Sequence, residues 1–163
     1  MNPLIRYGLI GGAIVGEVMV LLVLVNTLII RDFARGNFVE TRPTLVLAWV
    51  IAYPLLVILI FEAGGIFSAW LSRKHIHTGK EALITGVIAG VTIGIILEIM
   101  WIANILSLAA RAAEGVPGFG MGQENSLIVA GVLIVLVVMG GIVAASGAYI
   151  FAHSIDRKVI VEV

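Results

Sequence analysis

The fold of this chain is decided by residues 86–98, which read Gly-Val-Ile-Ala-Gly-Val-Thr-Ile-Gly-Ile-Ile-Leu-Glu. Glycines recur at every fourth position, Gly86, Gly90 and Gly94, and the next step of four lands on Glu98. On an α-helix this spacing places all four residues on nearly one face. The other residues are almost all aliphatic, which indicates a helix that lies in lipid. There, a stripe of small residues lets a neighbouring backbone approach closely.

The composition of the whole chain agrees with a membrane protein. Its 163 residues are 61% hydrophobic and 12% charged, with a mean hydropathy of +1.16. Soluble domains are about half apolar and about a quarter charged. The net charge is zero and no basic run is present, which argues against nucleic acid as a partner. The absence of cysteine excludes disulfides, thiolate metal sites and cysteine nucleophiles.

Four apolar runs are long enough to cross a bilayer, and they predict spans over residues 7–30, 45–71, 82–110 and 127–152. At about 1.5 Å per residue, each run covers a hydrocarbon core of roughly 30 Å. The first run is too long for a signal peptide, and no small-x-small cleavage site follows it. Pro54 predicts a kink in the second span. We therefore expect an all-α integral membrane four-helix bundle, a single membrane domain over residues 1–163.

Two separated matches within the chain indicate an internal duplication. Residues 8–16 align with residues 82–90 at an offset of 74, and residues 63–66 align with residues 139–142 at an offset of 76. Each copy would be a helical hairpin, and two spans per copy give both copies the same orientation in the membrane. The alternative is chance matching in a chain rich in Gly, Ile and Val. The predicted hairpin repeats are residues 4–74 and 82–158.

Three glutamates lie inside the predicted spans, and a charge in mid-bilayer costs at least ~2.5–3.5 kcal/mol. No lysine or arginine lies inside any span to neutralise them. A glutamate could therefore bond a neighbouring helix through Asn26, Asn104 or Thr92. It could instead carry a proton or bind a cation, or it could contact a polar group of a partner chain. The candidate proton, cation or interhelical polar residues are Glu17, Glu62, Glu98, Asn26 and Asn104.

Small residues at helical spacing predict close helix contacts, within the chain or between subunits. The candidate packing residues are Gly8, Gly12, Gly16, Gly86, Gly90, Gly94, Gly140 and Gly141.

Signs of catalysis are few. The sequence has no Gly-x-Ser-x-Gly, no His-Glu-x-x-His and no phosphate loop, so we expect a protein that is not an enzyme. The histidines His75, His77 and His153 fall outside the spans and are expected to be solvated. A metal shared by His75 and His77 is the alternative. We predict no cofactor and no bound metal.

Four spans place both termini on one side of the membrane. Six lysines and arginines fall on that side and four on the other. By the positive-inside rule this favours cytoplasmic termini in a multi-pass protein of the cell membrane.

Parts of the sequence resemble two known groups of membrane proteins. Met1-Asn2-Pro3 and residues 11–18, Gly-Gly-Ala-Ile-Val-Gly-Glu-Val, resemble the opening of the small multidrug resistance exporters. Those are four-helix dimers whose first-helix glutamate binds protons or cationic drugs, which implies that Glu17 is that site. The resemblance ends there, because the loops are longer and Glu98 adds a second mid-span glutamate. From Gly64-Gly65 to Gly90, the chain resembles small glycine-rich four-span bacterial and archaeal membrane proteins of unknown function, which implies the fold and no activity.

These features favour a non-catalytic accessory or scaffolding subunit that self-associates or joins a larger membrane complex. Its expected partners are the lipid bilayer, further copies of itself or other membrane subunits. The main alternative is a small proton-coupled transporter or channel that uses Glu17 and Glu98. A third hypothesis is a metal or lipid-headgroup site at the basic loop from Arg73 to Lys80.

Overall fold

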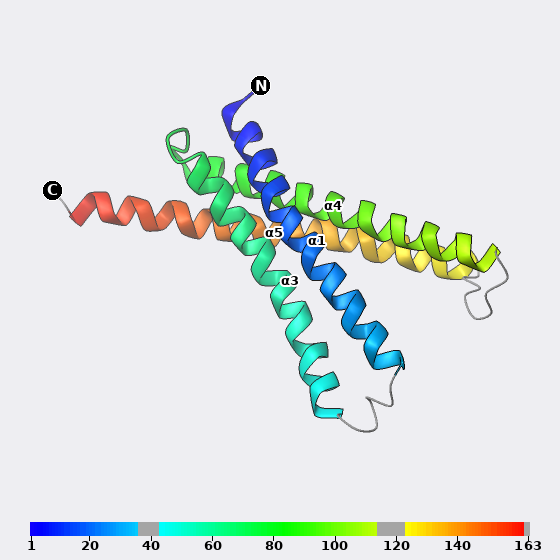
Figure 1. Cartoon of the computed structure of the whole chain (residues 1–163). Helices are drawn as coiled ribbons and strands as arrows, with labels where there is room; N and C mark the ends of the chain where they lie inside the picture. Colours follow the sequence, from blue (N-terminus) through cyan, green and yellow to red (C-terminus); the bar gives the residue numbers. More distant parts are fainter. Residues whose placement is uncertain (36–42, 114–122, 162–163) are drawn as a thin grey trace.

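The chain folds into four long α-helices (Figure 1). The computed structural model describes the backbone of residues 1–35, 43–113 and 123–161, and the side chains of residues 1–29, 43–100, 102–103 and 134–155. In chain order the helices are α1 (Pro3–Arg35), α3 (Pro43–Leu71), α4 (Gly79–Ala113) and α5 (Gln123–Val161).

Two helix starts are fixed by side chains that bond free backbone N–H groups. At α1, Pro3 takes the first helical position, and the Oδ1 of Asn2 accepts from the N–H of Leu4 at 2.9 Å. At α4, Thr78 and Glu81 form a capping box. The N–H of Thr78 donates to the Glu81 carboxylate at 3.0 Å, and the N–H of Glu81 donates to the Thr78 hydroxyl at 3.3 Å. The capping box at Thr78 and Glu81 ends the short turn between α3 and α4.

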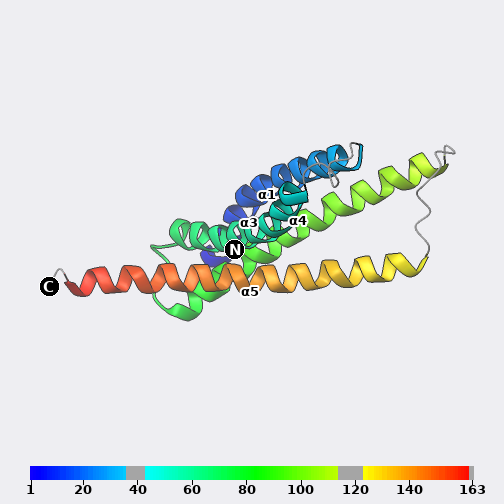
Figure 2. The same cartoon turned by 90° about the horizontal axis from the view of Figure 1, so that it is seen from below.

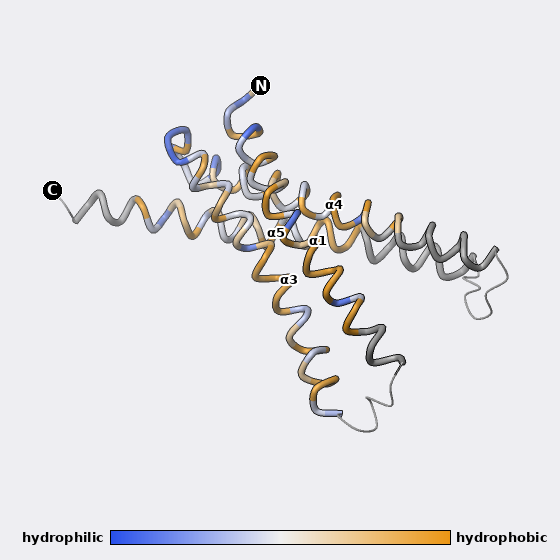
Figure 3. Tube along the Cα trace, in the orientation of Figure 1, coloured by the Kyte–Doolittle hydropathy of each residue, from blue (hydrophilic) through white to orange (hydrophobic). Residues whose placement is uncertain are grey.

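The prediction of four apolar spans is confirmed. Within the described residues, four stretches are long and apolar enough to cross a membrane: Pro3–Ile29, Pro43–Leu71, Gly79–Met100 and Ile134–Ile155. Helices α1, α4 and α5 extend beyond the predicted spans at both ends, whereas α3 starts two residues earlier than predicted and ends at Leu71 as predicted. In Figure 3, α1 and α3 are mostly hydrophobic, and the turn between α3 and α4 is hydrophilic. Helix α3 continues through Pro54 as one helix.

The helices form two hairpins that cross each other. In Figure 1, α1 lies beside α3 and α4 beside α5, and the two pairs diverge from the end that carries the α3–α4 turn. Figure 2 shows α3 and most of α1 on one side of α5. Helix α4 packs against both α1 and α5, and α3 packs against the other three helices. In the described part of the chain, α1 does not contact α5.

A small apolar core joins the two hairpins. Met19 of α1, Phe61 of α3, and Ile93 and Leu97 of α4 form a buried cluster. The first half of α3 contributes little to it, since Leu47, Val50 and Leu55 are all more than half exposed. Lipid or another protein must therefore cover most of this apolar surface.

Helix α1 packs on α4 through its glycines. A Cβ added at Gly12 would lie 2.7 Å from the carbonyl oxygen of Ala89, and one at Gly8 would lie 2.9 Å from the Cβ of Ile88. Gly16 lies against the side chain of Ile96. The first glycine stripe thus forms one of the contacts between the two hairpins.

Helix α4 uses its own glycine stripe differently. A Cβ at Gly86 would lie 2.6 Å from the carbonyl oxygen of Ala144, and one at Gly94 would lie 2.9 Å from Val137 of α5. Gly90 lies against the backbone of Gly140, and a Cβ there would be 2.7 Å from the Cα of Gly141. The second stripe therefore holds α4 against α5, inside one hairpin.

A third seam joins α3 to α5. Gly65 lies against the backbone of Ala144, Gly140 lies against the ring of Phe61, and Gly147 lies against Glu62. Gly141 is different, because a Cβ there would find its nearest neighbour at an ordinary 3.7 Å. Gly64, Gly65 and Gly147 also pack closely, although they were not among the predicted packing residues.

Candidate functional site

Glu17 lies on the outer face of α1, close to the middle of the apolar span Pro3–Ile29. Its side chain is exposed, and so are the aliphatic side chains one turn to either side, Ile14 at 48% and Leu21 at 62%. The neighbouring Gly16 faces α4, and a single residue step turns the helix by about 100°. Glu17 therefore points away from the rest of the chain.

Glu62 lies at the contact between α3 and α5. A Cβ at Gly147 would be 2.6 Å from its carbonyl oxygen and 2.9 Å from its Cγ. The side chain is half-buried. The absence of a side chain at Gly147 gives the methylene groups of Glu62 room to lie against α5.

Glu98 continues the glycine stripe of α4 that packs on α5, and it is half-buried. Gly94, four residues earlier, lies against Val137. The next turn of α5 includes residues whose side chains are outside the described part. Glu17 and Glu98 therefore lie in different environments, one exposed and the other on a packed stripe.

Two of the three polar side chains suggested as partners of the glutamates bond elsewhere. The Oδ1 of Asn26 accepts from the indole N–H of Trp49 at 2.8 Å, which ties α1 to α3. The hydroxyl of Thr92 donates to the carbonyl oxygen of Ile88 at 2.7 Å, within its own helix. The side chain of Asn104 is outside the described residues. Among the hydrogen bonds of the described residues, none involves Glu17, Glu62 or Glu98.

The three glutamates do not form a common site in the described structure. They belong to three different helices, and the described residues contain no group of three or more His, Asp or Glu placed to hold a metal ion. His75 stacks on Tyr7 with ring centroids 5.7 Å apart, and His153 stacks on Tyr149 at 6.3 Å. His75 and His77 are both exposed.

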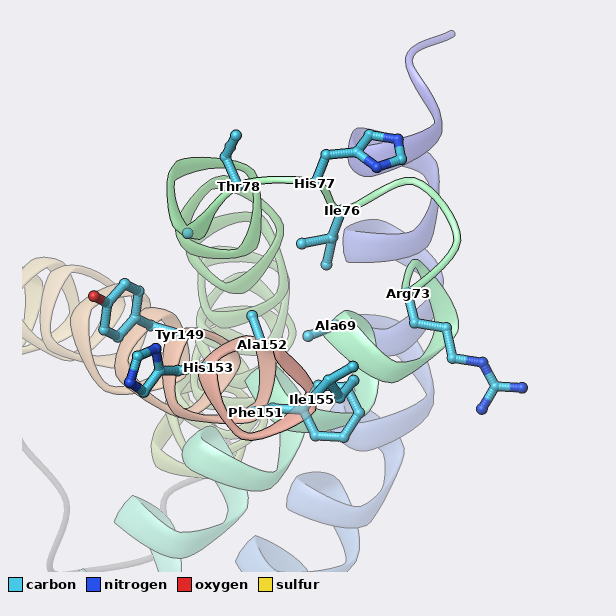
Figure 4. Close-up of a pocket in the computed structure, with 11 residues that line it drawn as sticks. Ala69, Arg73, Ile76, His77, Thr78, Tyr149, Phe151, Ala152, His153 and Ile155 are labelled. Carbon is cyan, nitrogen blue, oxygen red and sulfur yellow. The ribbon is translucent and has the colours of Figure 1, made fainter. Parts of the chain in front are cut away.

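A cavity of about 140 Å³ lies where the α3–α4 turn meets the last turns of α5 (Figure 4). Ile76, Ala69 and Ala152 lie in its middle, while Tyr149 and His153 lie on one side and Arg73 on the other. The guanidinium of Arg73 lies over the ring of Trp70, 5.1 Å from its centroid. The tyrosine and His153 could not be assigned to this place from sequence, because they are about 75 residues from the turn along the chain.

Comparison with known proteins adds no further constraint, since no protein-family model, curated protein or solved structure matches the chain.

Proposed function

We propose that this chain is a non-catalytic membrane protein that acts as an accessory or scaffolding subunit and associates with other membrane-spanning chains through the outer face of α1. The observation that supports this most is the exposure of Glu17 in the middle of an apolar span. An ionised carboxyl group in mid-bilayer costs at least ~2.5–3.5 kcal/mol. A neighbouring chain that supplies a hydrogen bond to a lipid-facing carboxyl group lowers this cost, so association with such a chain is favoured.

The donor for Glu17 is best supplied from outside the chain. The predicted spans contain no lysine or arginine, and Asn26 and Thr92 are already bonded. A helix of a second chain, laid along the outer face of α1, could present a hydroxyl, amide, carboxylic acid or basic group to Glu17. Interhelical bonds of this kind hold membrane helices together, with about 1–2 kcal/mol each in model peptides.

The absence of natural cysteines allows a direct test by cross-linking in the membrane. A thiol-reactive photocrosslinker attached to Leu21→Cys, on the outer face of α1, is expected to capture a second chain. The same reagent on Ile142→Cys, an exposed position of α5, serves as the matched control and is expected to capture much less. Adding Glu17→Leu to Leu21→Cys should lower the captured fraction about fivefold or more, because the polar contact is lost. Glu17→Gln should keep most of it, since an amide still donates and accepts.

Equal capture from both positions, or capture unaffected by Glu17→Leu, would contradict the proposal. The transport alternative predicts a different result. In liposomes, Glu17→Gln and Glu98→Gln would each abolish pH-dependent flux while the protein remained folded.

The proposed location is the cell membrane, with both termini in the cytoplasm. The N-terminus and the basic α3–α4 turn lie at the same end, as the contact between Tyr7 and His75 indicates. The turn carries Arg73, Lys74 and Lys80, which the positive-inside rule assigns to the cytoplasm. A reporter active only in the cytoplasm should therefore work when fused to the C-terminus. Activity of an exported reporter at that position would reverse the orientation.

We also propose that the two hairpins are duplicated copies assembled into one bundle. Support comes from the sequence matches and from the order of the helices, α1–α3 and α4–α5, as two antiparallel pairs. The copies have diverged in packing, because equivalent glycines such as Gly12 and Gly86 contact different helices.

A further inference from the structure

The cavity between the α3–α4 turn and α5 combines an apolar interior with a polar rim. Its apolar walls include Ile76, Phe151 and Ile155, and its polar walls include Arg73, His77 and His153. A volume of about 140 Å³ exceeds roughly tenfold what one water molecule requires, so a group as large as a phosphate fits. Tyr149 closes one side, since its ring packs against Gly79 at the start of α4.

Positive charge prevails at this end of the molecule. Among the residues whose side chains are described, this end carries one carboxylate, Glu81, and four cations, Arg6, Arg73, Lys74 and Lys80. That carboxylate already accepts hydrogen bonds from the N–H groups of His77 and Thr78, at 2.7 and 3.0 Å. The cavity thus lies at an end of the molecule where, among the side chains that the structure describes, cations outnumber carboxylates, and the described carboxylate Glu81 is held in the capping box.

Aromatic rings mark this end as the level of the membrane surface. The guanidinium of Arg73 lies over the ring of Trp70, Tyr7 stacks with His75, and Tyr149 stacks with His153. Tryptophan and tyrosine concentrate at the height of lipid headgroups. In Figure 4 the side chain of Arg73 extends outward from the rim of the cavity. Its guanidinium lies over Trp70, and the N–H groups at its edge remain able to donate to a phosphate bound at the outer edge of the cavity.

We propose that this cavity binds the phosphate of an anionic phospholipid headgroup. The polar rim, with Arg73 as the main charge, would contact the phosphate, and the apolar walls would contact the upper part of an acyl chain. Basic pockets between membrane helices recognise acidic lipids in this way. Free inorganic phosphate could make the same polar contacts as the headgroup. It has no acyl chain to contact Ile76, Phe151 and Ile155, so these apolar walls favour binding of a lipid over binding of free phosphate. The site is independent of the proposed contact at Glu17.

The test measures how much phosphatidylglycerol stays bound to the full chain, by native mass spectrometry after extraction from equimolar phosphatidylglycerol and phosphatidylcholine. Phosphatidylglycerol is expected to be retained preferentially. Arg73→Gln combined with His77→Gln should lower its retention about fivefold, the effect expected for one basic group near an anionic lipid. Arg6→Gln combined with Lys74→Gln, which removes two charges from the same end but none from the cavity, should leave retention unchanged.

A second variant separates the cavity from general electrostatic attraction. Ala152→Leu fills the cavity without changing any charge, and it should reduce retention as strongly as Arg73→Gln combined with His77→Gln. Equal loss in the Arg6 and Lys74 control, or normal retention in Ala152→Leu, would overturn the proposal. Displacement of the lipid by an equal concentration of inorganic phosphate would also overturn it, in favour of a soluble phosphate. Thermal melting of each variant confirms that it is folded.

Discussion

Replacing Gly90 by leucine is expected to destabilise the protein by about 3 kcal/mol or more, because the new side chain has no space between α4 and α5. Gly90 lies against the backbone of Gly140, and even a Cβ would be 2.7 Å from the Cα of Gly141. Backbone atoms cannot turn aside as a side chain can, so the two helices must separate along their contact. Thermal unfolding of the purified protein in a mild detergent measures the loss.

Two substitutions on the same helix provide the comparison. Ile95→Leu changes an exposed side chain and should leave the unfolding temperature unchanged. Glu98→Gln keeps the size and the hydrogen-bonding capacity of a half-buried residue, and we expect the variant to fold and to assemble normally. If Gly90→Leu lowered the unfolding temperature no more than Glu98→Gln, the close packing of α4 against α5 described here would be wrong.

Gly65→Ala is expected to have the largest effect of any single added methyl group. Gly65 lies directly against the carbonyl group of Ala144, and a Cβ would be 2.6 Å from its carbon atom and 2.9 Å from its Cα. We expect a loss of about 1–3 kcal/mol, typical of overpacking, and an unfolding temperature lowered by several degrees.

Gly141→Ala is the matched control, since it adds the same methyl group to a buried glycine of the neighbouring helix. A Cβ there would meet Val91 at 3.7 Å, an ordinary van der Waals contact. Alanine is also a better helix former than glycine by about 0.5–1 kcal/mol, so this variant should be neutral or slightly more stable. A smaller loss for Gly65→Ala than for Gly141→Ala would contradict the packing of α3 on α5.

The four membrane spans could be predicted because lipid demands long uninterrupted apolar runs, and these are visible in the sequence. The partner of each glycine face could not. Gly8, Gly12 and Gly16 have the same spacing as Gly86, Gly90 and Gly94, yet the first set meets α4 and the second meets α5. Spacing defines a face of a helix, but the helix that covers it depends on how the two hairpins cross.

The outward direction of Glu17 could have been read from the sequence. It follows Gly16 by one residue, and a helix turns about 100° per residue, so Glu17 lies off the glycine stripe of α1, whereas Glu98 continues the glycine stripe of α4. The cavity could not be predicted, because it brings the turn after α3 to residues near the end of α5. A contact between residues so far apart in the chain leaves no local sequence pattern from which it could be predicted.

We expect Glu17 to find its partner on another chain, and the mass of the native assembly is a direct test of this contact. The protein would be extracted from its own membrane in nanodiscs, weighed, and every co-purifying chain identified. We predict an assembly heavier than the single chain of 17.3 kDa, either a defined oligomer or a complex with other membrane proteins. A single chain of 17.3 kDa, free of partners under the gentlest extraction, would contradict the account.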